Sequence, residues 1–208
     1  MTILSVNKTR EKERWALCAH FLFIMGADCA HFYVSGGFPM NKHTRYLVQA
    51  AVIAALYAVL THLQNLILPG SATWMIQMRL SEALCVLAFF TPAAVPGLAL
   101  GCLVFNITFA AALPLDFLVG SLATLLAAQA MWKTRNLCVR DFPLVGMLMP
   151  ALFNAVLVGW ELAVYIGGGF WLNALYVAIG EAAVLLIPGS VLYYALKKRH
   201  LAEKLFAA

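Results

Sequence analysis

Residues 46–68 read YLVQAAVIAALYAVLTHLQNLIL, and this stretch decides the class of fold. It contains no Asp, Glu, Lys or Arg, and it ends at Pro69-Gly70. A helix of about 20 predominantly apolar residues is long enough to cross the hydrocarbon core of a bilayer. The stretch therefore predicts a helix that spans a membrane.

The whole chain shares this apolar character. Of its 208 residues, 63% are hydrophobic and 11% are charged, and the mean hydropathy is +0.87. A soluble domain carries about 25% charged residues, because charge keeps its surface in water. The composition therefore excludes an ordinary soluble globular protein, a disordered chain and a nucleic-acid-binding protein that uses a basic face. What remains is an integral membrane protein.

Five further apolar stretches follow the first. Residues 80–113 are long enough for two helices, and Pro92 and Pro96 divide them, because proline cannot donate an intrahelical hydrogen bond. The last three stretches are residues 115–132, 142–166 and 171–196. We therefore expect an all-α integral membrane protein with six transmembrane helices and short connections.

The orientation of the helices follows from lysine and arginine, which are enriched in cytoplasmic loops. If the first helix enters from the cytoplasm, nine basic residues fall inside and Arg79 alone falls outside. The nine are Lys42, Arg45, Lys133, Arg135, Arg140, Lys197, Lys198, Arg199 and Lys204. We therefore expect both termini to be cytoplasmic.

The N-terminal part of the chain fits this scheme poorly. Its apolar segment contains Asp28, and a seventh span there would place the basic cluster at residues 8–14 outside. Met40 stands just before the first span and reads as a natural start. We expect an N-terminal extension from a misassigned start, a six-helix membrane domain and a cytoplasmic tail. These parts cover residues 1–39, 40–200 and 201–208.

Several kinds of chemistry are absent from the sequence. There is no Gly-Lys pair of a phosphate-binding loop, no His-Glu-x-x-His and no Gly-x-Ser-x-Gly. No nucleophile and base can be paired, so a membrane enzyme is disfavoured and we expect no enzymatic activity. The five cysteines have no metal-binding spacing and are interpreted as small apolar side chains. They are Cys18, Cys29, Cys85, Cys102 and Cys138.

Charged groups at membrane depth are costly and often mark functional sites. Outside the cytoplasmic loop, five such residues remain within the spans and outer loops: Arg79, Glu82, Asp116, Glu161 and Glu181. Arg79 and Glu82 stand three residues apart and could pair with one another. Asp116 could instead cap its helix, where the dipole favours an acidic group. Neither Glu161 nor Glu181 has a cation nearby in sequence, which favours a role in ligand binding.

Amides and aromatic rings complete the candidate substrate-binding set, which adds Asn106, Asn154, Trp160, Trp171 and Asn173. Such a set suits a planar, hydrogen-bonding small molecule, either neutral or cationic. A carboxylate can accept two parallel hydrogen bonds from a guanine-like edge, while an asparagine or arginine donates to the carbonyl oxygen. Tryptophan can stack on the ring, although tryptophans also anchor helices at membrane interfaces. A second carboxylate would favour an amine substituent.

Small residues let helices approach closely in lipid. Ala50, Ala54 and Ala58 form such a stripe on the first helix, and Gly97 and Gly101 form a Gly-x-x-x-Gly on the third. Packing inside the bundle can explain any such stripe. The first helix is nevertheless the better candidate for docking a partner protein, because its alanines cover a broad face without charge.

The run QMRLSEAL at residues 77–84 resembles the signature of the QueT family, which comprises substrate-binding (S) components of energy-coupling factor (ECF) transporters for queuosine precursors. The resemblance spans residues 40–200. It continues through Gly97, Gly101, Cys102, Asn106, Asp116, Gly120, Ser121, Leu122, Ala123, Thr124, Asn154, Ala155, Gly159, Trp160, Glu161, Gly180 and Glu181. Residues 109–115 depart from the family, whose relatives tend to have a Ser-Pro-Phe-Gly-like turn before the aspartate.

The resemblance implies an S-component-like bundle in a prokaryotic plasma membrane. It implies capture from outside of a queuosine precursor, namely preQ0, preQ1 or a queuine-like deazaguanine. A membrane coupling protein would bind the alanine-rich helix, and two partner ATPases would use ATP, with no cofactor bound by this chain. The residues alone leave open a stand-alone proton-coupled carrier that uses Glu161 or Glu181 as its proton site.

Overall fold

A computed structural model describes most of the region in which spans are expected. The described residues are 41–69, 71, 78–109, 113–140 and 142–198. The extension expected at residues 1–39, the tail at 201–208 and the basic residues Arg199 and Lys204 lie outside them. These expectations stay predictions.

The described secondary structure is helical, apart from one isolated bridge between Val139 and Phe142. In chain order, the helices are α2 (Lys42–Ile67), η1 (Leu80–Phe89), α3 (Ala94–Thr108), α4 (Asp116–Thr134), α5 (Leu144–Met147), α6 (Met149–Tyr165), α7 (Phe170–Val184), η2 (Leu185–Gly189) and α8 (Ser190–Lys198). The element η1 is a 3-10 helix, and η2 is a π-helical turn that contains Pro188. The all-helical class is thus confirmed.

Three described stretches are long and apolar enough to cross a membrane, namely Lys42–Ile67, Leu144–Tyr165 and Phe170–Lys198. They coincide with the first, fifth and sixth expected spans. The helices η1 and α3 are apolar but shorter, with 10 and 15 residues. A full count of six spans and cytoplasmic termini stay predictions.

The chain does form two helices within residues 80–113, and the break between them is at Pro92. The helix η1 ends at Phe89, and α3 begins at Ala94. Pro96 does not divide the segment, because it lies in the first turn of α3, where its missing N–H breaks no intrahelical bond. One proline therefore ends one helix, and the other helps to begin the next.

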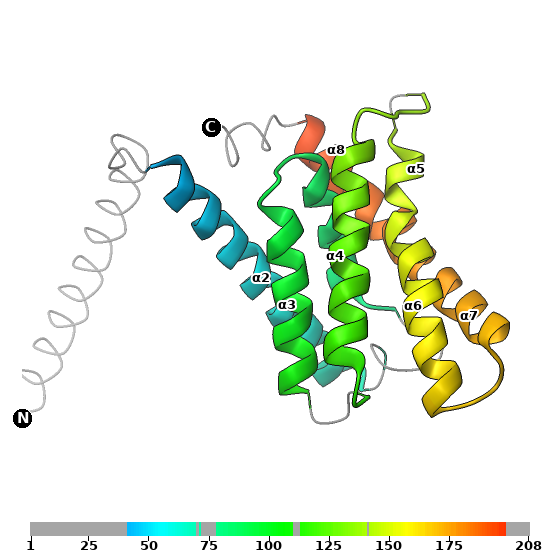
Figure 1. The fold of residues 1–208 in the computed structure, drawn as a ribbon. Coiled ribbons are helices and arrows are strands. Elements are labelled where there is room, and N and C mark those ends of the chain that lie inside the picture. The colour runs from blue at the N-terminus through cyan, green and yellow to red at the C-terminus, as the bar shows by residue number, and fades with distance from the viewer. Residues whose placement is uncertain (1–40, 70, 72–77, 110–112, 141, 199–208) are drawn as a thin grey trace, which may run out of the picture. The chain divides into compact units, whose positions relative to one another are not determined.

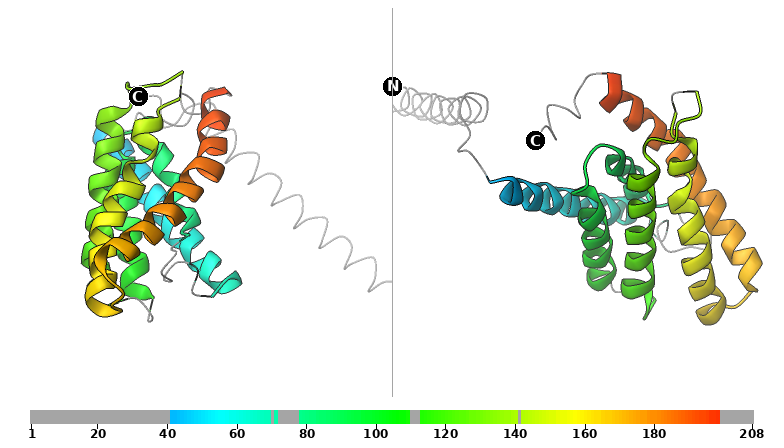
Figure 2. Two further views of the ribbon diagram at one scale, coloured as in Figure 1. Left: turned by 90° about the vertical axis from the view of Figure 1, so that its right-hand side faces the viewer. Right: turned by 45° about the horizontal axis from the view of Figure 1, so that its top comes forward.

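The helices pack in a series in which each touches the next: α2 on α3, α3 on α4, α4 on α6 and α6 on α7. Figure 1 and Figure 2 show α3, α4 and α6 side by side, with α2 and the α7–α8 stretch crossing them at an angle. The short helix η1 lies between these elements and contacts α2, α3, α4, α7, η2 and α8. Its position makes it the centre of the packed region.

The two ends of this bundle differ in charge. The beginnings of α2 and α5 and the ends of α4 and α8 lie at one end (Figure 1), and the described lysines are at these termini. They are Lys42, Lys133, Lys197 and Lys198. The segregation agrees with the orientation expected from the positive-inside rule.

The alanine stripe of α2 packs against α3, which corrects the expectation that it docks a partner. A Cβ added to Gly97 would lie 2.8 Å from the Ala50 carbonyl oxygen, and one added to Gly101 would lie 2.7 Å from that of Ala54. Ala50 and Ala58 are buried. The small residues on both helices allow this close backbone approach. Ala50, Ala54 and Ala58 are thus used inside the chain.

Candidate binding site

Every acidic side chain that the structure describes is buried, and Arg79 is buried with them. The exposed fractions are 3% for Arg79, 1% for Glu82, 4% for Asp116, 0% for Glu161 and 1% for Glu181. Charged groups are almost never fully buried unless they are paired. Because η1 with the residue before it, α4, α6 and α7 bring these residues inward from distant parts of the sequence, the cluster is a property of the fold.

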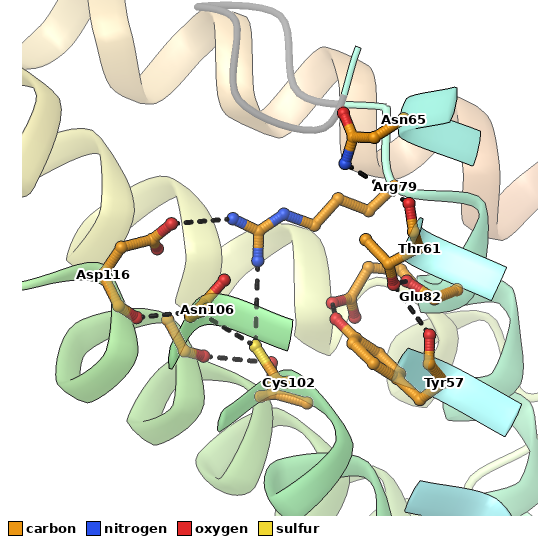
Figure 3. A network of polar contacts seen from close by, with 11 residues as sticks. Tyr57, Thr61, Asn65, Arg79, Glu82, Cys102, Asn106 and Asp116 are labelled. Carbon is orange, nitrogen blue, oxygen red and sulfur yellow. Dashed lines mark hydrogen bonds and ion pairs between the residues drawn. The ribbon is translucent and has the colours of Figure 1, made fainter. Parts of the chain in front are cut away.

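Arg79 forms an ion pair with Asp116, in which Nη2 lies 3.3 Å from Oδ2 (Figure 3). Its Nη1 donates to the Cys102 sulfur at 3.7 Å. The Asn106 side chain donates to the same sulfur at 3.6 Å and to the main-chain oxygen of Asp116 at 2.8 Å. Asp116 lies in the first turn of α4, but it holds Arg79 rather than capping the helix.

Glu82 is held by two donors instead of by Arg79, which corrects the expected Arg79–Glu82 pair. The Tyr57 hydroxyl of α2 donates to Oε1 (Figure 3), and the Cys85 thiol donates to Oε2 at 3.0 Å. Tyr57 is fully buried. The structure also corrects the interpretation of Cys85 and Cys102 as purely apolar side chains, since both are buried but make polar contacts.

The backbone on both sides of Arg79 is fixed by one amide side chain of α2. Gln64 donates to the Met78 carbonyl oxygen, and its own oxygen accepts from the Leu80 N–H at 2.7 Å. The same amide nitrogen donates to Ser71 at 2.9 Å. Arg79 is therefore positioned through the main chain of its two neighbours as well as through its ion pair.

Glu161 on α6 and Glu181 on α7 approach the same guanidinium. The charge of Glu161 interacts with those of Asp116 and Arg79, and that of Glu181 interacts with those of Glu82 and Arg79. Asn154 on α6 is buried as well. One described cation therefore lies within electrostatic reach of all four described carboxyl groups.

Eight buried side-chain atoms have no hydrogen-bond partner among the described residues. Seven are carbonyl or carboxyl oxygens, which are acceptors when the carboxyl groups are ionised, and one is a hydroxyl. They are Asn65 Oδ1, Asn106 Oδ1, Asp116 Oδ1, Ser121 Oγ, Glu161 Oε1, Glu161 Oε2, Asn173 Oδ1 and Glu181 Oε2. A buried polar atom left without a partner costs about 1–3 kcal/mol, and native proteins contain few. These oxygens could accept hydrogen bonds from a ligand rich in N–H groups.

Gly120 allows the side chains of Asp116 and Asn106 to lie close to the backbone of α4. A Cβ at this position would lie 2.8 Å from Asp116 Oδ1, 3.0 Å from Asn106 Nδ2 and 3.8 Å from Arg79 Nη1. The Thr124 hydroxyl donates to the Gly120 carbonyl oxygen at 3.0 Å. Any side chain at Gly120 would occupy the volume next to the polar groups.

Asn173 ties the α6–α7 connection to this region. Its Nδ2 donates to the Gly167 carbonyl oxygen at 2.7 Å, while its Oδ1 is one of the unpartnered acceptors. Three consecutive glycines form the connection, with φ of 89° at Gly167, 85° at Gly168 and 83° at Gly169. These positive φ values are readily adopted by glycine alone.

Eight of the ten residues predicted to bind substrate are buried. The other two, Trp160 and Trp171, are 50% and 83% exposed, so the structure does not bring them to the cluster. Trp160 directly precedes the buried Glu161 and therefore points to another face of α6. The aromatic ring beside the site is instead that of Phe105, whose centroid lies 5.9 Å from the Arg79 guanidinium carbon.

Sequence reasoning missed a polar face of the first helix. Tyr57, Thr61, Gln64 and Asn65 follow one another at helical spacing, and all four are buried. Thr61 hydrogen-bonds to Ser81 at 2.7 Å, at the start of η1. Because these side chains carry no formal charge, a search for charged residues passed over them. Their i, i+4, i+7, i+8 spacing was the signal that could have found them.

Comparison with known proteins gives one match. The family model described as QueT transporter matches residues 47–198. No curated protein and no solved structure matches the chain. The matched range contains the whole buried polar cluster.

Proposed function

Because the chain belongs to the QueT transporter family and is a membrane transporter rather than an enzyme, we propose that it is the substrate-binding S component of an ECF importer. Its substrate is a queuosine precursor of the deazaguanine class, captured from outside the cell. The bundle then crosses a prokaryotic plasma membrane six times, with both termini cytoplasmic.

The observation that carries this proposal is the set of unpartnered acceptor oxygens around Arg79. Glu161 has two of them, and both are buried. The N1–H and 2-amino group of a guanine-like base form two parallel donors, which match the two oxygens of one carboxylate. Asn106 and Asn173 present further acceptors for N–H groups at the edges of the ring.

The location of the cluster supports capture from the outer side. Asp116 begins α4, and Glu161 lies near the end of α6. Both of these termini lie at the end of the bundle opposite to the termini that carry the described lysines (Figure 1). If the lysines face the cytoplasm, the polar cluster is reached more directly from outside.

The drive for uptake must come from elsewhere, because the sequence contains no phosphate-binding loop. Two partner ATPases and a membrane coupling protein supply it in this proposal, with ATP bound by the partners. The alanines of α2 that remain exposed are Ala51 and Ala55, four residues apart. They replace the buried stripe as the proposed contact with the coupling protein.

One observation favours a second candidate, a stand-alone proton-coupled carrier. Glu161 and Glu181 are 0% and 1% exposed within the apolar helices α6 and α7. An ionisable side chain at membrane depth is a candidate site for a proton relay. This candidate predicts uptake by the chain alone in liposomes with a pH gradient, whereas an S component requires its partners and ATP.

Isothermal titration of the full-length chain with preQ0, preQ1 and queuine tests the proposed substrate. Glu161→Gln replaces one acceptor oxygen by a donor, so we expect its affinity for the bound base to fall about 100-fold. Trp160→Phe changes the exposed neighbour and serves as the matched control, with unchanged affinity. No binding of any of the three bases, or unchanged affinity in Glu161→Gln, would contradict the proposal.

A further inference from the structure

Aromatic rings hold the connection between α4 and α5 against α8. The Phe142 ring stacks on that of Tyr194, with centroids 5.8 Å apart, and meets that of Tyr193 edge-on at 5.7 Å. Both are favoured arrangements of aromatic pairs. Two segments that are far apart in the sequence therefore form one surface, at the end of the bundle where α4 and α8 end (Figure 1).

This surface is strongly basic. Residues 133–142 and α8 contain five basic residues and one acidic residue, Asp141. Arg135 is half-buried and the other four basic side chains are exposed, whereas the carboxyl groups that the structure describes are all buried. We call the five basic residues the basic face: Lys133, Arg135, Arg140, Lys197 and Lys198.

Two cations of the basic face lie against aromatic rings. The Arg135 guanidinium carbon lies 3.8 Å from the centroid of the Trp132 ring, and Nη1 donates to the Trp132 carbonyl oxygen at 2.7 Å. Lys197 Nζ lies 5.7 Å from the centroid of the Tyr193 ring. A cation–π contact positions a cation without cancelling its charge. These two side chains are therefore ordered and still attract an anion.

Arg140 adopts a backbone conformation that does not suit its residue type. Its φ is 50°, and it is the one non-glycine residue with positive φ in the described part of the chain. Val139 and Phe142 close the turn around it by exchanging two backbone hydrogen bonds, with N–O distances of 2.8 and 3.2 Å. Asparagine would adopt this conformation more readily than arginine. The exposed charge of Arg140, rather than its backbone preference, therefore points to its role.

Exposed apolar side chains lie among these cations. Leu137 is 59% exposed and Val139 55%, both in the connection that carries Arg135 and Arg140, and Tyr194 is 51% exposed on α8. Apolar groups beside Lys and Arg suit the interface of a bilayer, where the former enter the acyl region and the latter reach the headgroups. A free phosphate ion would leave these apolar side chains in water, so the combination favours a lipid.

We propose that the basic face binds the phosphate headgroup of an anionic phospholipid in the leaflet that this end of the bundle meets. Guanidinium groups bind phosphate through two parallel hydrogen bonds, and lysines add positive charge. Basic clusters next to membrane-spanning helices attract anionic lipids in this way. The proposal concerns a surface at the opposite end from the start of α4 and does not depend on which substrate the chain carries.

Competition between two lipids tests the proposal. The purified full-length chain is equilibrated in detergent micelles that contain equal amounts of phosphatidylglycerol and phosphatidylcholine, and native mass spectrometry counts the lipids that it retains. We expect about tenfold more bound phosphatidylglycerol, because a basic residue near the surface strengthens binding of an anionic lipid about fivefold. Equal retention of the two lipids would overturn the proposal. Displacement of the lipid by excess glycerol phosphate would also overturn it, in favour of a site for a free phosphate group.

A matched pair of double variants assigns the site. Arg140→Asn with Lys198→Gln removes two charges while asparagine still accepts the positive φ, so we expect the preference to fall to within about twofold. Arg140→Lys with Lys198→Arg keeps both charges and should keep the preference. An equal preference in the two variants would show that the lipid binds elsewhere. Thermal unfolding curves establish that both variants are folded, and each outcome leaves the proposed substrate binding unaffected.

Discussion

Arg79 is the residue on which the geometry of the site depends. It is fixed by the Asp116 carboxylate at 3.3 Å and by the contacts of Gln64 with Met78 and Leu80 on either side. A guanidinium held before a ligand arrives loses little conformational entropy on binding. The surrounding carboxyl groups are thus arranged about a preorganised cation.

The smallest change that tests this geometry is Gly120→Ala. The new Cβ would lie 2.8 Å from Asp116 Oδ1, so the carboxylate must move and its ion pair with Arg79 must weaken. Overpacking of this kind costs about 1–3 kcal/mol, and we expect about tenfold weaker binding of the preferred base.

Titration of this variant is compared with Leu118→Ala, which changes an exposed side chain of the same helix. The control should bind as the unmodified chain does. Equal affinity in Gly120→Ala and the control would show that the close packing at Gly120 does not serve the ligand.

At the level of the helices, the sequence predicts where most elements lie but not the geometry of each one. Apolar length located the helices to within a few residues, and Pro92 located the break between η1 and α3. The 3-10 geometry of η1 was not predicted, because it depends on packing against six other elements. A 3-10 helix rises about 2.0 Å per residue, so these residues reach further than an α-helix of equal length.

The binding site, too, could be predicted only in part. Scarcity of charge within the spans predicted Arg79, Asp116 and Glu161 as substrate-binding residues, and the structure buries all three side chains. The partner of Arg79 lies 37 positions away, so no local pattern could show that it is Asp116 rather than Glu82. Trp160 and Trp171 were predicted to bind substrate because of their residue type, whereas their positions around the helix axis were not considered.

A prediction at this scale concerns the contact between α2 and α3. In Gly101→Leu, the Cβ of the new side chain would lie 2.7 Å from the Ala54 carbonyl oxygen and 2.7 Å from Tyr57 Cβ. The helices must separate, which moves Tyr57 away from Glu82. We expect about 1–3 kcal/mol lower stability and weaker binding of the base.

Thermal unfolding in detergent, with and without ligand, measures both effects. Ala55→Leu is the matched control, because Ala55 is exposed on α2 and can accept a larger side chain. A melting temperature in Gly101→Leu equal to that of the control would contradict the close packing of the two helices.

The whole molecule separates its charges along the bundle. The described lysines lie at one end, while the described carboxyl groups lie buried in the interior. Because basic residues are enriched in cytoplasmic loops, this separation underlies the proposed orientation of the transporter. The orientation can be tested without any ligand.

Cys138 provides the probe, since it is exposed in the connection between α4 and α5, near Arg135 and Arg140. With the other four cysteines replaced by serine, a membrane-impermeant maleimide should fail to label Cys138 in intact cells and label it after permeabilisation. Ile166→Cys, made in a chain that lacks Cys138, should label in intact cells, because Ile166 is exposed and the proposed topology places the α6–α7 connection outside. The reverse pattern would invert the proposed topology.

The connection of Gly167, Gly168 and Gly169 has a consequence for how the chain can vary. A Cβ on Gly167 or Gly169 would meet nothing within 4 Å, so no neighbouring atom forbids a side chain there. The positive φ at each position still disfavours an L-residue, at a cost of about 1–3 kcal/mol per residue. An L-residue is therefore rejected for its handedness and not its size, and a D-alanine introduced by chemical synthesis would fit where L-alanine would not.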